Sequence, residues 1–85
     1  MIIYAVYVLW SKEESKFYIG FTSDIERRIK EHRSGKVHTT KRYKSLDLIY
    51  YEKFVSEVDA RRREKYLKTT QGKKGLRLIL RDTIK

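Results

Sequence analysis

The chain has 85 residues, 40% of them apolar, and a net charge of +10 from 21 Lys and Arg against 11 Asp and Glu. This length supports one hydrophobic core, so we expect a single domain over residues 1–85. The lack of cysteine excludes disulfides and thiolate zinc sites. No apolar run reaches the roughly 18 residues that cross a bilayer. These two observations together predict a cytoplasmic protein without membrane contact.

Two β-like segments open the chain. Residues 2–10 are rich in β-branched and aromatic side chains, a polar break follows, and residues 16–21 form a second such run. Two runs joined by a short polar turn predict an antiparallel hairpin. Gly20 marks a position where the backbone bends or another group approaches it closely.

A helix and a third strand are expected next. Ser23 followed by Glu26 is a capping-box pattern, which predicts a helix that runs to about Arg33. Residues 36–45 read as a basic loop, and residues 46–54 read as the third strand.

Two further helices complete the pattern. Ser56 with Asp59 repeats the capping-box spacing and predicts a helix to about Lys68, and apolar residues at helical spacing predict a short helix over residues 73–80. The order β-β-α-β-α-α therefore predicts an α+β fold, with a three-stranded, mostly antiparallel sheet flanked by helices.

The expected helices carry polar groups on apolar stripes. Glu64 shares a stripe with Ala60 and Leu67, and a carboxylate there is costly to bury unless it is paired or binds a metal. The alternatives are a salt bridge to an arginine or an exposed position. On the first helix, His32 shares the apolar stripe and Arg28 lies beside it. His32 can be a hydrogen-bonded, partly buried histidine, and Arg28 can be the edge of a solvated basic face.

Charge and tyrosine usage allow more than one interpretation. The basic excess attracts polyanions and speeds encounters with phosphate backbones, but it can also serve solubility, and charge alone does not separate DNA from RNA or anionic lipid. Tyr7 and Tyr18 belong to a set of strand tyrosines whose usual role is packing with a polar tip.

Two short motifs carry a family resemblance. Ala5-Val6-Tyr7 and Tyr18-Ile19-Gly20 resemble the paired signatures of the GIY-YIG nucleases, and Arg28 follows Tyr18 by ten positions, as the helix arginine of that family does. With the later segments around His32 and Glu64, the resemblance covers about residues 4–80 and is similar to small standalone bacterial members.

The resemblance implies metal-dependent hydrolysis of phosphodiester bonds in DNA, with selectivity for DNA structure in repair or recombination. Glu64 would hold a divalent cation, Mg²⁺ or Mn²⁺, and Arg28 would contact the scissile phosphate. Tyr7 and Tyr18 would line the site, and His32 would assist through a hydrogen bond or a phosphate contact. Tyr7 could take the proton of the attacking water if nearby cations lower its pKa.

The chain also departs from the family pattern. Ala5 replaces the first glycine of the signature, and Phe21 stands where some excision-repair relatives carry a lysine, so one phosphate contact is missing or supplied elsewhere. No extra DNA-binding module accompanies the domain, so a protein partner could supply specificity. The alternative function is a nucleic-acid-binding module with little or no catalysis.

Overall fold

The computed structural model describes residues 1–33 and 46–85, which form a three-stranded sheet flanked by helices. The elements in chain order are β1 (Tyr4–Ser11), β2 (Lys16–Thr22), α1 (Ile25–Arg33), β3 (Leu46–Phe54), α3 (Glu57–Leu67) and α4 (Thr70–Ile79). The strand order is β2-β1-β3, and both pairings are antiparallel. The predicted α+β fold and element order are confirmed, while the expected basic loop at 36–45 lies outside the described residues.

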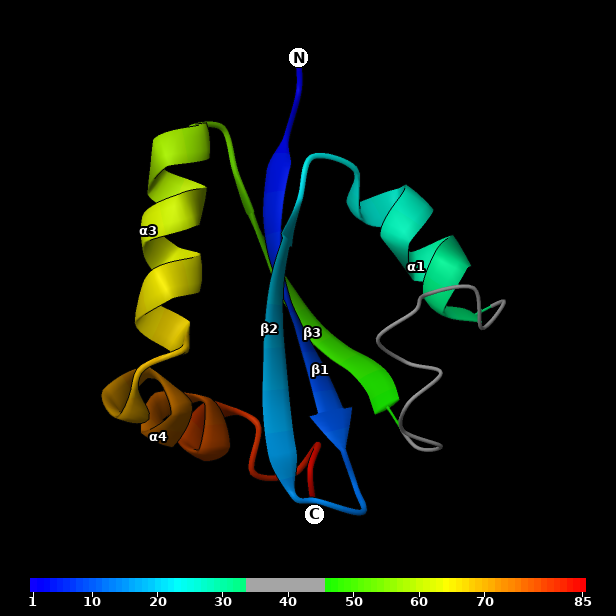
Figure 1. Ribbon diagram of the computed structural model, residues 1–85, viewed down its shortest axis with the longest axis vertical. Helices are drawn as coiled ribbons and strands as arrows, with labels where there is room; N and C mark the ends of the chain where they lie inside the picture. Colours follow the sequence, from blue (N-terminus) through cyan, green and yellow to red (C-terminus); the bar gives the residue numbers. More distant parts are fainter. Residues whose placement is uncertain (34–45) are drawn as a thin grey trace.

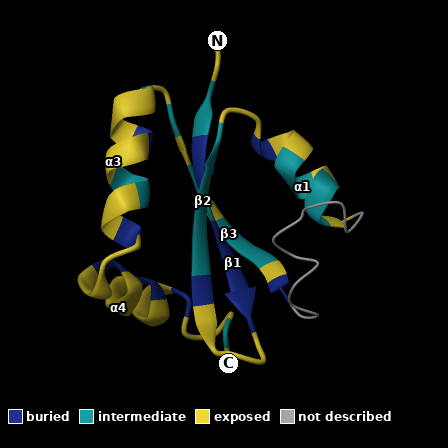
Figure 2. Cartoon of the chain, viewed as in Figure 1, coloured by how far each residue is buried: buried dark blue, intermediate teal, exposed yellow. Residues whose placement is uncertain are grey.

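The sheet separates two layers of helices. Figure 1 shows α3 and α4 on one side of the twisted sheet and α1 on the other. Because successive strand side chains point to opposite faces, Val6 and Val8 of the central strand face α3 and α4, whereas Tyr7 faces the opposite way. Burial follows this arrangement, with β1 mostly buried and the outer faces of the helices exposed (Figure 2).

The main core lies between the sheet and the pair α3 and α4. It consists of buried apolar side chains from both layers: Val6, Val8, Trp10, Phe17, Ala60, Leu67, Leu76 and Leu80. Ala60 and Leu67 are the apolar members of the stripe that the sequence predicted around Glu64, so α3 presents the expected face to the sheet. None of the helices in the described part of the chain has the length and apolar composition that a membrane crossing requires.

Helix caps fix where α3 and α1 begin. Ser56 accepts a hydrogen bond from the Asp59 backbone N–H at 3.2 Å, so the predicted cap of α3 is confirmed. At α1 the predicted cap was wrong by one residue, because Asp24 rather than Ser23 fills that role. Asp24 Oδ1 accepts from the Arg27 N–H at 3.1 Å, and the Asp24 carbonyl accepts the first intrahelical bond, from Arg28 N–H at 3.1 Å.

The last helix begins earlier than the sequence predicted. α4 starts at Thr70 because the Thr69 side chain accepts from the Gly72 N–H at 3.1 Å and so caps it. Gly72 packs directly on the end of α3, where an added Cβ would lie 2.2 Å from the Tyr66 carbonyl oxygen. The glycine therefore allows the two helices to meet at a tight corner.

A hydrogen-bonded cluster joins α3 to β3. The Arg63 guanidinium donates two hydrogen bonds to the Glu52 carboxylate, from Nε at 2.8 Å and from Nη2 at 3.0 Å, and the Tyr50 hydroxyl donates a third at 2.7 Å. Because a bidentate pair is directional, it restricts the rotation of α3 against the sheet. Glu64 follows Arg63 on the same helix, so this restriction also limits where the Glu64 backbone lies relative to the sheet.

Candidate active site

The ring of Tyr7 lies across Gly20. The two residues are direct partners between β1 and β2, and a Cβ added to Gly20 would lie 2.2 Å from Tyr7 Cζ and 2.4 Å from its hydroxyl oxygen. The close approach expected at Gly20 is therefore confirmed. Because β2 is an edge strand, the phenol reaches the border of the sheet, where side chains from either helical layer can approach it.

Arg28 approaches Tyr7 from α1. Its Cζ lies 5.5 Å from the centroid of the Tyr7 ring, and its Nε is buried without a hydrogen-bond acceptor among the described residues. Buried donors usually have partners. A guanidinium held beside a phenol with an unused buried N–H is well suited to bind an anion, and phosphate oxygens match its planar geometry.

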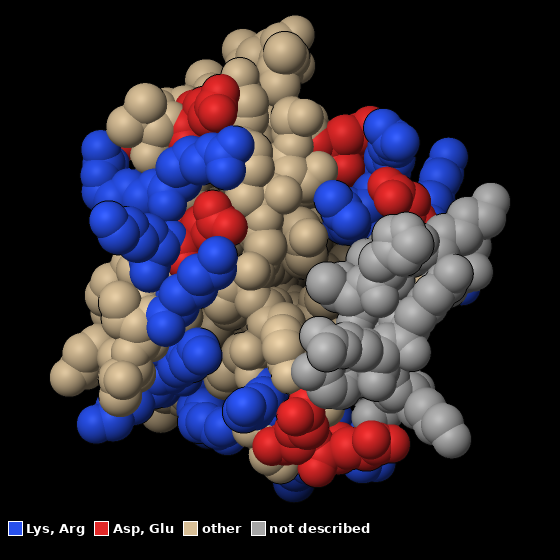
Figure 3. Space-filling view, in the orientation of Figure 1, with Lys and Arg blue, Asp and Glu red and all other residues tan. Residues whose placement is uncertain are grey.

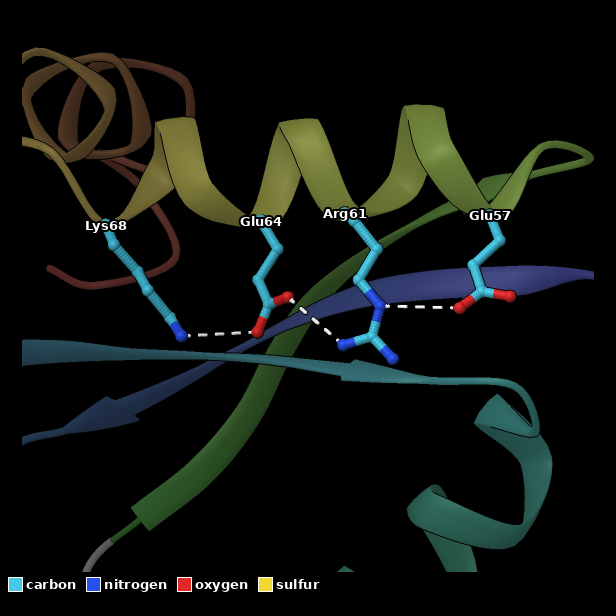
Figure 4. A network of polar contacts seen from close by, with 4 residues as sticks. All are labelled: Glu57, Arg61, Glu64 and Lys68. Atoms are coloured by element: carbon cyan, nitrogen blue, oxygen red, sulfur yellow. Dashed lines mark hydrogen bonds and ion pairs between the residues drawn. The ribbon is translucent and has the colours of Figure 1, made fainter.

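Glu64 approaches the same border from α3. Its side chain is 17% exposed, its Oε2 accepts a hydrogen bond from Lys68 Nζ at 3.2 Å, and its Oε1 lies 4.0 Å from Arg61 Nη1 (Figure 4). The salt bridge that the sequence left open as an alternative is therefore present, although both partners come from the same helix. Both are more than half exposed, so these contacts contribute little to stability.

Charged side chains on α1 and α3 both affect the pKa of the Tyr7 phenol. Burial raises the pKa of Tyr7, the nearby Arg28 cation opposes that rise, and the Glu64 carboxylate adds to it. The sequence made a proton-accepting role for Tyr7 conditional on nearby cations lowering this pKa, and among the described side chains desolvation outweighs the Arg28 cation. Tyr7 therefore stays protonated at neutral pH, and its hydroxyl can donate a hydrogen bond.

Tyr18 and Tyr7 line one surface hollow of about 440 Å³. Apolar and basic side chains complete the lining, which comprises Leu9, Lys16, Phe17, Ile19, Gly20, Leu46, Lys68 and Lys73. The Tyr18 hydroxyl donates to Glu14 Oε1 at 2.7 Å. In the space-filling view, Lys and Arg gather over α3 and again over α1, and a largely uncharged strip separates them (Figure 3).

His32 lies apart from this hollow. Its Nε2 accepts a hydrogen bond from the Leu48 backbone N–H at 3.1 Å, and the side chain lines a different depression, between α1 and β3. This geometry matches the hydrogen-bonded, partly buried histidine that the sequence left open. Since Arg28 is one helical turn earlier, the His32 contact anchors the helix that carries the arginine.

The sequence interpretation missed Lys68 as part of the site. Lys68 both contacts Glu64 and lines the hollow with Tyr7 and Tyr18. The Glu64–Lys68 spacing of four residues is a known signal for a helical ion pair, so the contact was open to prediction. The position of Lys68 in the hollow depends on how α3 packs on β2, and the spacing of residues along one helix does not predict that packing.

The three-stranded antiparallel sheet with its flanking helices is a nuclease-like fold. The family model of the GIY-YIG catalytic domain matches residues 3–77, and the chain belongs to this family. GIY-YIG nucleases generally use a divalent metal.

Relatives of similar size share most of the chain. A UPF0213 protein of Clostridium perfringens is 37% identical over 94% of this chain and 86% of its own length. One of Staphylococcus haemolyticus is 37% identical over 87% of this chain and 90% of its own length. The solution NMR structure of a UPF0213 protein from Bacillus halodurans has a TM-score of 0.58 and 31% identity, covering 92% of this chain and 85% of that one. These names state no activity.

Proposed function

We propose that the protein is a metal-dependent endonuclease that hydrolyses phosphodiester bonds in DNA. One observation carries this proposal. The Arg28 guanidinium from α1 and the Glu64 carboxylate from α3 both influence the pKa of the Tyr7 phenol, which crosses the edge strand at Gly20. A phosphodiester is anionic, so its hydrolysis needs positive charge and hydrogen-bond donors where negative charge develops.

The residues present fit a divalent ion that relies on one protein carboxylate. No group of three or more His, Asp or Glu side chains that could hold an ion by itself occurs within residues 1–33 and 46–85. Mg²⁺ suits such a place, because it keeps several waters and takes other ligands from substrate phosphates, and Mn²⁺ can substitute. Glu64 would hold the ion, which supplies Lewis-acid stabilisation of the phosphate oxygens.

The protein side chains have separate roles in this proposal. Arg28 binds a nonbridging oxygen of the scissile phosphate through its planar fork. Tyr7, whose hydroxyl is protonated at neutral pH, donates a hydrogen bond to a phosphate oxygen or orients the attacking water. Tyr18 lines the same hollow and supports the bound strand. His32 acts as a positioning residue, since it fixes α1 through Leu48.

The proposed substrates are branched or nicked DNA of the kind formed in repair and recombination, and a protein partner would add specificity. Basic residues lie on both sides of the uncharged strip, so the phosphate backbone of a bound DNA can be contacted from either side of the strip (Figure 3). The second candidate is a binding module with little catalysis. It is favoured by the ion pairs of Glu64 with Lys68 and Arg61, because a metal ion must compete with both cations.

Cleavage of defined DNA tests the proposal. Purified protein is incubated with supercoiled plasmid and with a branched oligonucleotide, in Mg²⁺ or in chelator. We expect nicking only with Mg²⁺, and we expect Glu64→Gln to abolish it while DNA binding remains nearly intact.

Asp59→Asn is the matched control, because it removes a carboxylate from the same helix at an exposed position where Asp59 pairs with Arg62. This variant should cleave like the wild type. Undiminished cleavage by Glu64→Gln would rule out the metal assignment. Binding without any nick in the wild type would favour the second candidate.

A further inference from the structure

One face of α3 carries a row of alternating charges that points toward β2. The row is Glu57, Arg61, Glu64 and Lys68, and its members lie three or four residues apart along the helix (Figure 4). Arg61 Nε lies 3.5 Å from Glu57 and Nη1 lies 4.0 Å from Glu64. Arg61 is therefore the guanidinium next to the proposed metal ligand on the α3 side.

Arg61 stacks on an aromatic ring in addition to its two ion pairs. Its Cζ lies 3.8 Å from the centroid of Phe21 in β2, the shortest cation–ring distance among the described residues. A guanidinium that stacks on a ring keeps its N–H edges available for other partners. The stack therefore fixes the orientation of Arg61 and leaves its donors accessible.

The donors of Arg61 are only loosely engaged. Both carboxylate distances exceed ordinary hydrogen-bond lengths, no described residue accepts a hydrogen bond from its guanidinium, and the side chain is 56% exposed. By contrast, Arg63 on the same helix donates two short bonds to Glu52. An arginine that stacks on a ring and makes only long contacts with its neighbouring carboxylates can still donate to an incoming anion.

From this geometry we infer that Arg61 binds a backbone phosphate of the DNA, opposite Arg28. The two arginines stand on opposite sides of β2: Arg28 contacts Tyr7 from α1, and Arg61 stacks on Phe21 from α3. The phosphate backbone is thereby held from both helical layers. This inference rests on the proposed function, because it assigns a further contact for the same substrate.

A salt titration of DNA binding in chelator tests this role without metal or cleavage. The probe is a fluorescent branched DNA, and the variants are Arg61→Gln, Arg62→Gln and Phe21→Leu. Each phosphate contact adds about 0.9 to the slope of log affinity against log salt. We expect Arg61→Gln to reduce the magnitude of that slope by about 0.9, which corresponds to the loss of one phosphate contact. Binding should weaken by about five- to tenfold near 0.1 M salt.

Arg62→Gln removes the same charge from the same helix, but Arg62 bonds to Asp59 and its side chain is 70% exposed. It should leave the slope unchanged. Phe21→Leu keeps the charge of Arg61 and removes the ring on which it stacks, although it also removes the Phe21 stack on Tyr4, so a smaller loss of affinity is expected. Equal effects of Arg61→Gln and Arg62→Gln would overturn the inference, as would a wild-type slope for Arg61→Gln.

The outcomes separate this inference from the proposed function. If Glu64→Gln abolishes cleavage but Arg61→Gln binds like the wild type, only the role of Arg61 fails. If the wild type does not bind the probe at low salt, both proposals fail. Circular dichroism of each variant shows whether the fold is retained, and Arg61→Lys, which keeps the charge but not the planar stack, should bind with intermediate affinity.

Discussion

Tyr7 and Gly20 are cross-strand partners whose relationship sets the geometry of the site. The Tyr7 ring occupies the space where a side chain at position 20 would lie, with Cζ, the hydroxyl oxygen and Cε1 all within 2.7 Å of an ideal Cβ. The phenol can cross the edge strand only because position 20 has no side chain. That crossing brings it within the influence of Arg28 and Glu64.

Gly20→Ala should therefore displace the Tyr7 ring. We expect the free energy of unfolding to fall by about 1–3 kcal/mol, because the added methyl overlaps the Tyr7 ring and forces it from its place across the strand. Cleavage should be lost with it. Chemical unfolding and plasmid nicking measure the two effects. Combining Gly20→Ala with Tyr7→Ala removes the clash, so the double variant should lose less stability than the two single variants added together, and it should not recover cleavage. If Gly20→Ala is as stable as the wild type, the Tyr7 ring does not lie across Gly20.

Arg28→Lys keeps the charge and removes the planar fork. We expect cleavage to slow by a factor on the order of 10²–10³, the usual cost of losing one positioned electrostatic donor, while the free energy of unfolding changes by less than about 1 kcal/mol. Arg27→Lys is the matched control, because Arg27 is 77% exposed and pairs with Glu31 at 3.4 Å. Similar rates for the two variants would exclude a phosphate contact by Arg28.

Glu52→Gln tests the cluster that orients α3. Burial opposes the ionisation of Glu52, but hydrogen bonds from Arg63 and Tyr50 outweigh it and lower the pKa of Glu52. Burial and the bond to Glu52 in turn raise the pKa of Tyr50 to about 12, so Tyr50 remains a donor. We expect Glu52→Gln to cost about 1 kcal/mol near neutral pH, since the group is partly exposed.

The pH dependence of this loss has a definite sign. A carboxylate whose pKa is lower in the folded state stabilises the fold above its unfolded pKa, and this contribution disappears as pH falls through the folded value. The wild type and Glu52→Gln should therefore differ near neutral pH and converge below the ordinary value of 4.5. Urea unfolding at several pH values measures the difference. Glu57→Gln, at an exposed i,i+4 pair, should have little effect at any pH.

Gly72→Ala should separate α4 from α3. An added Cβ would lie 2.2 Å from the Tyr66 carbonyl oxygen and 2.7 Å from Leu67 Cα, both backbone atoms that cannot rotate away. We expect a loss of about 1–3 kcal/mol in thermal unfolding. Gly75→Ala in the same helix meets nothing within 4 Å and should stabilise by up to about 1 kcal/mol through helix propensity. Equal effects of the two changes would contradict the close packing at Gly72.

Most of the fold could be predicted because it depends on local patterns. The third strand was predicted over residues 46–54 and is observed as Leu46–Phe54, and the Ser56 cap lies where its spacing placed it. Strand alternation, helical periodicity and capping each involve residues a few positions apart. The errors, at the Asp24 cap and the start of α4, arose where a neighbouring side chain or a tight helix corner decided the boundary.

Patterns along the chain were enough to predict the class of fold, the resemblance to the family and the position of Glu64 on an apolar stripe. The packing of separate elements was needed to show that Tyr7 crosses Gly20, that the pKa of Tyr7 rises, that His32 lies outside the hollow and that Arg61 stacks on Phe21. The physical reason is that periodicity fixes which face of an element a residue occupies. The distances and burial that control electrostatics depend on how separate elements pack across the sheet.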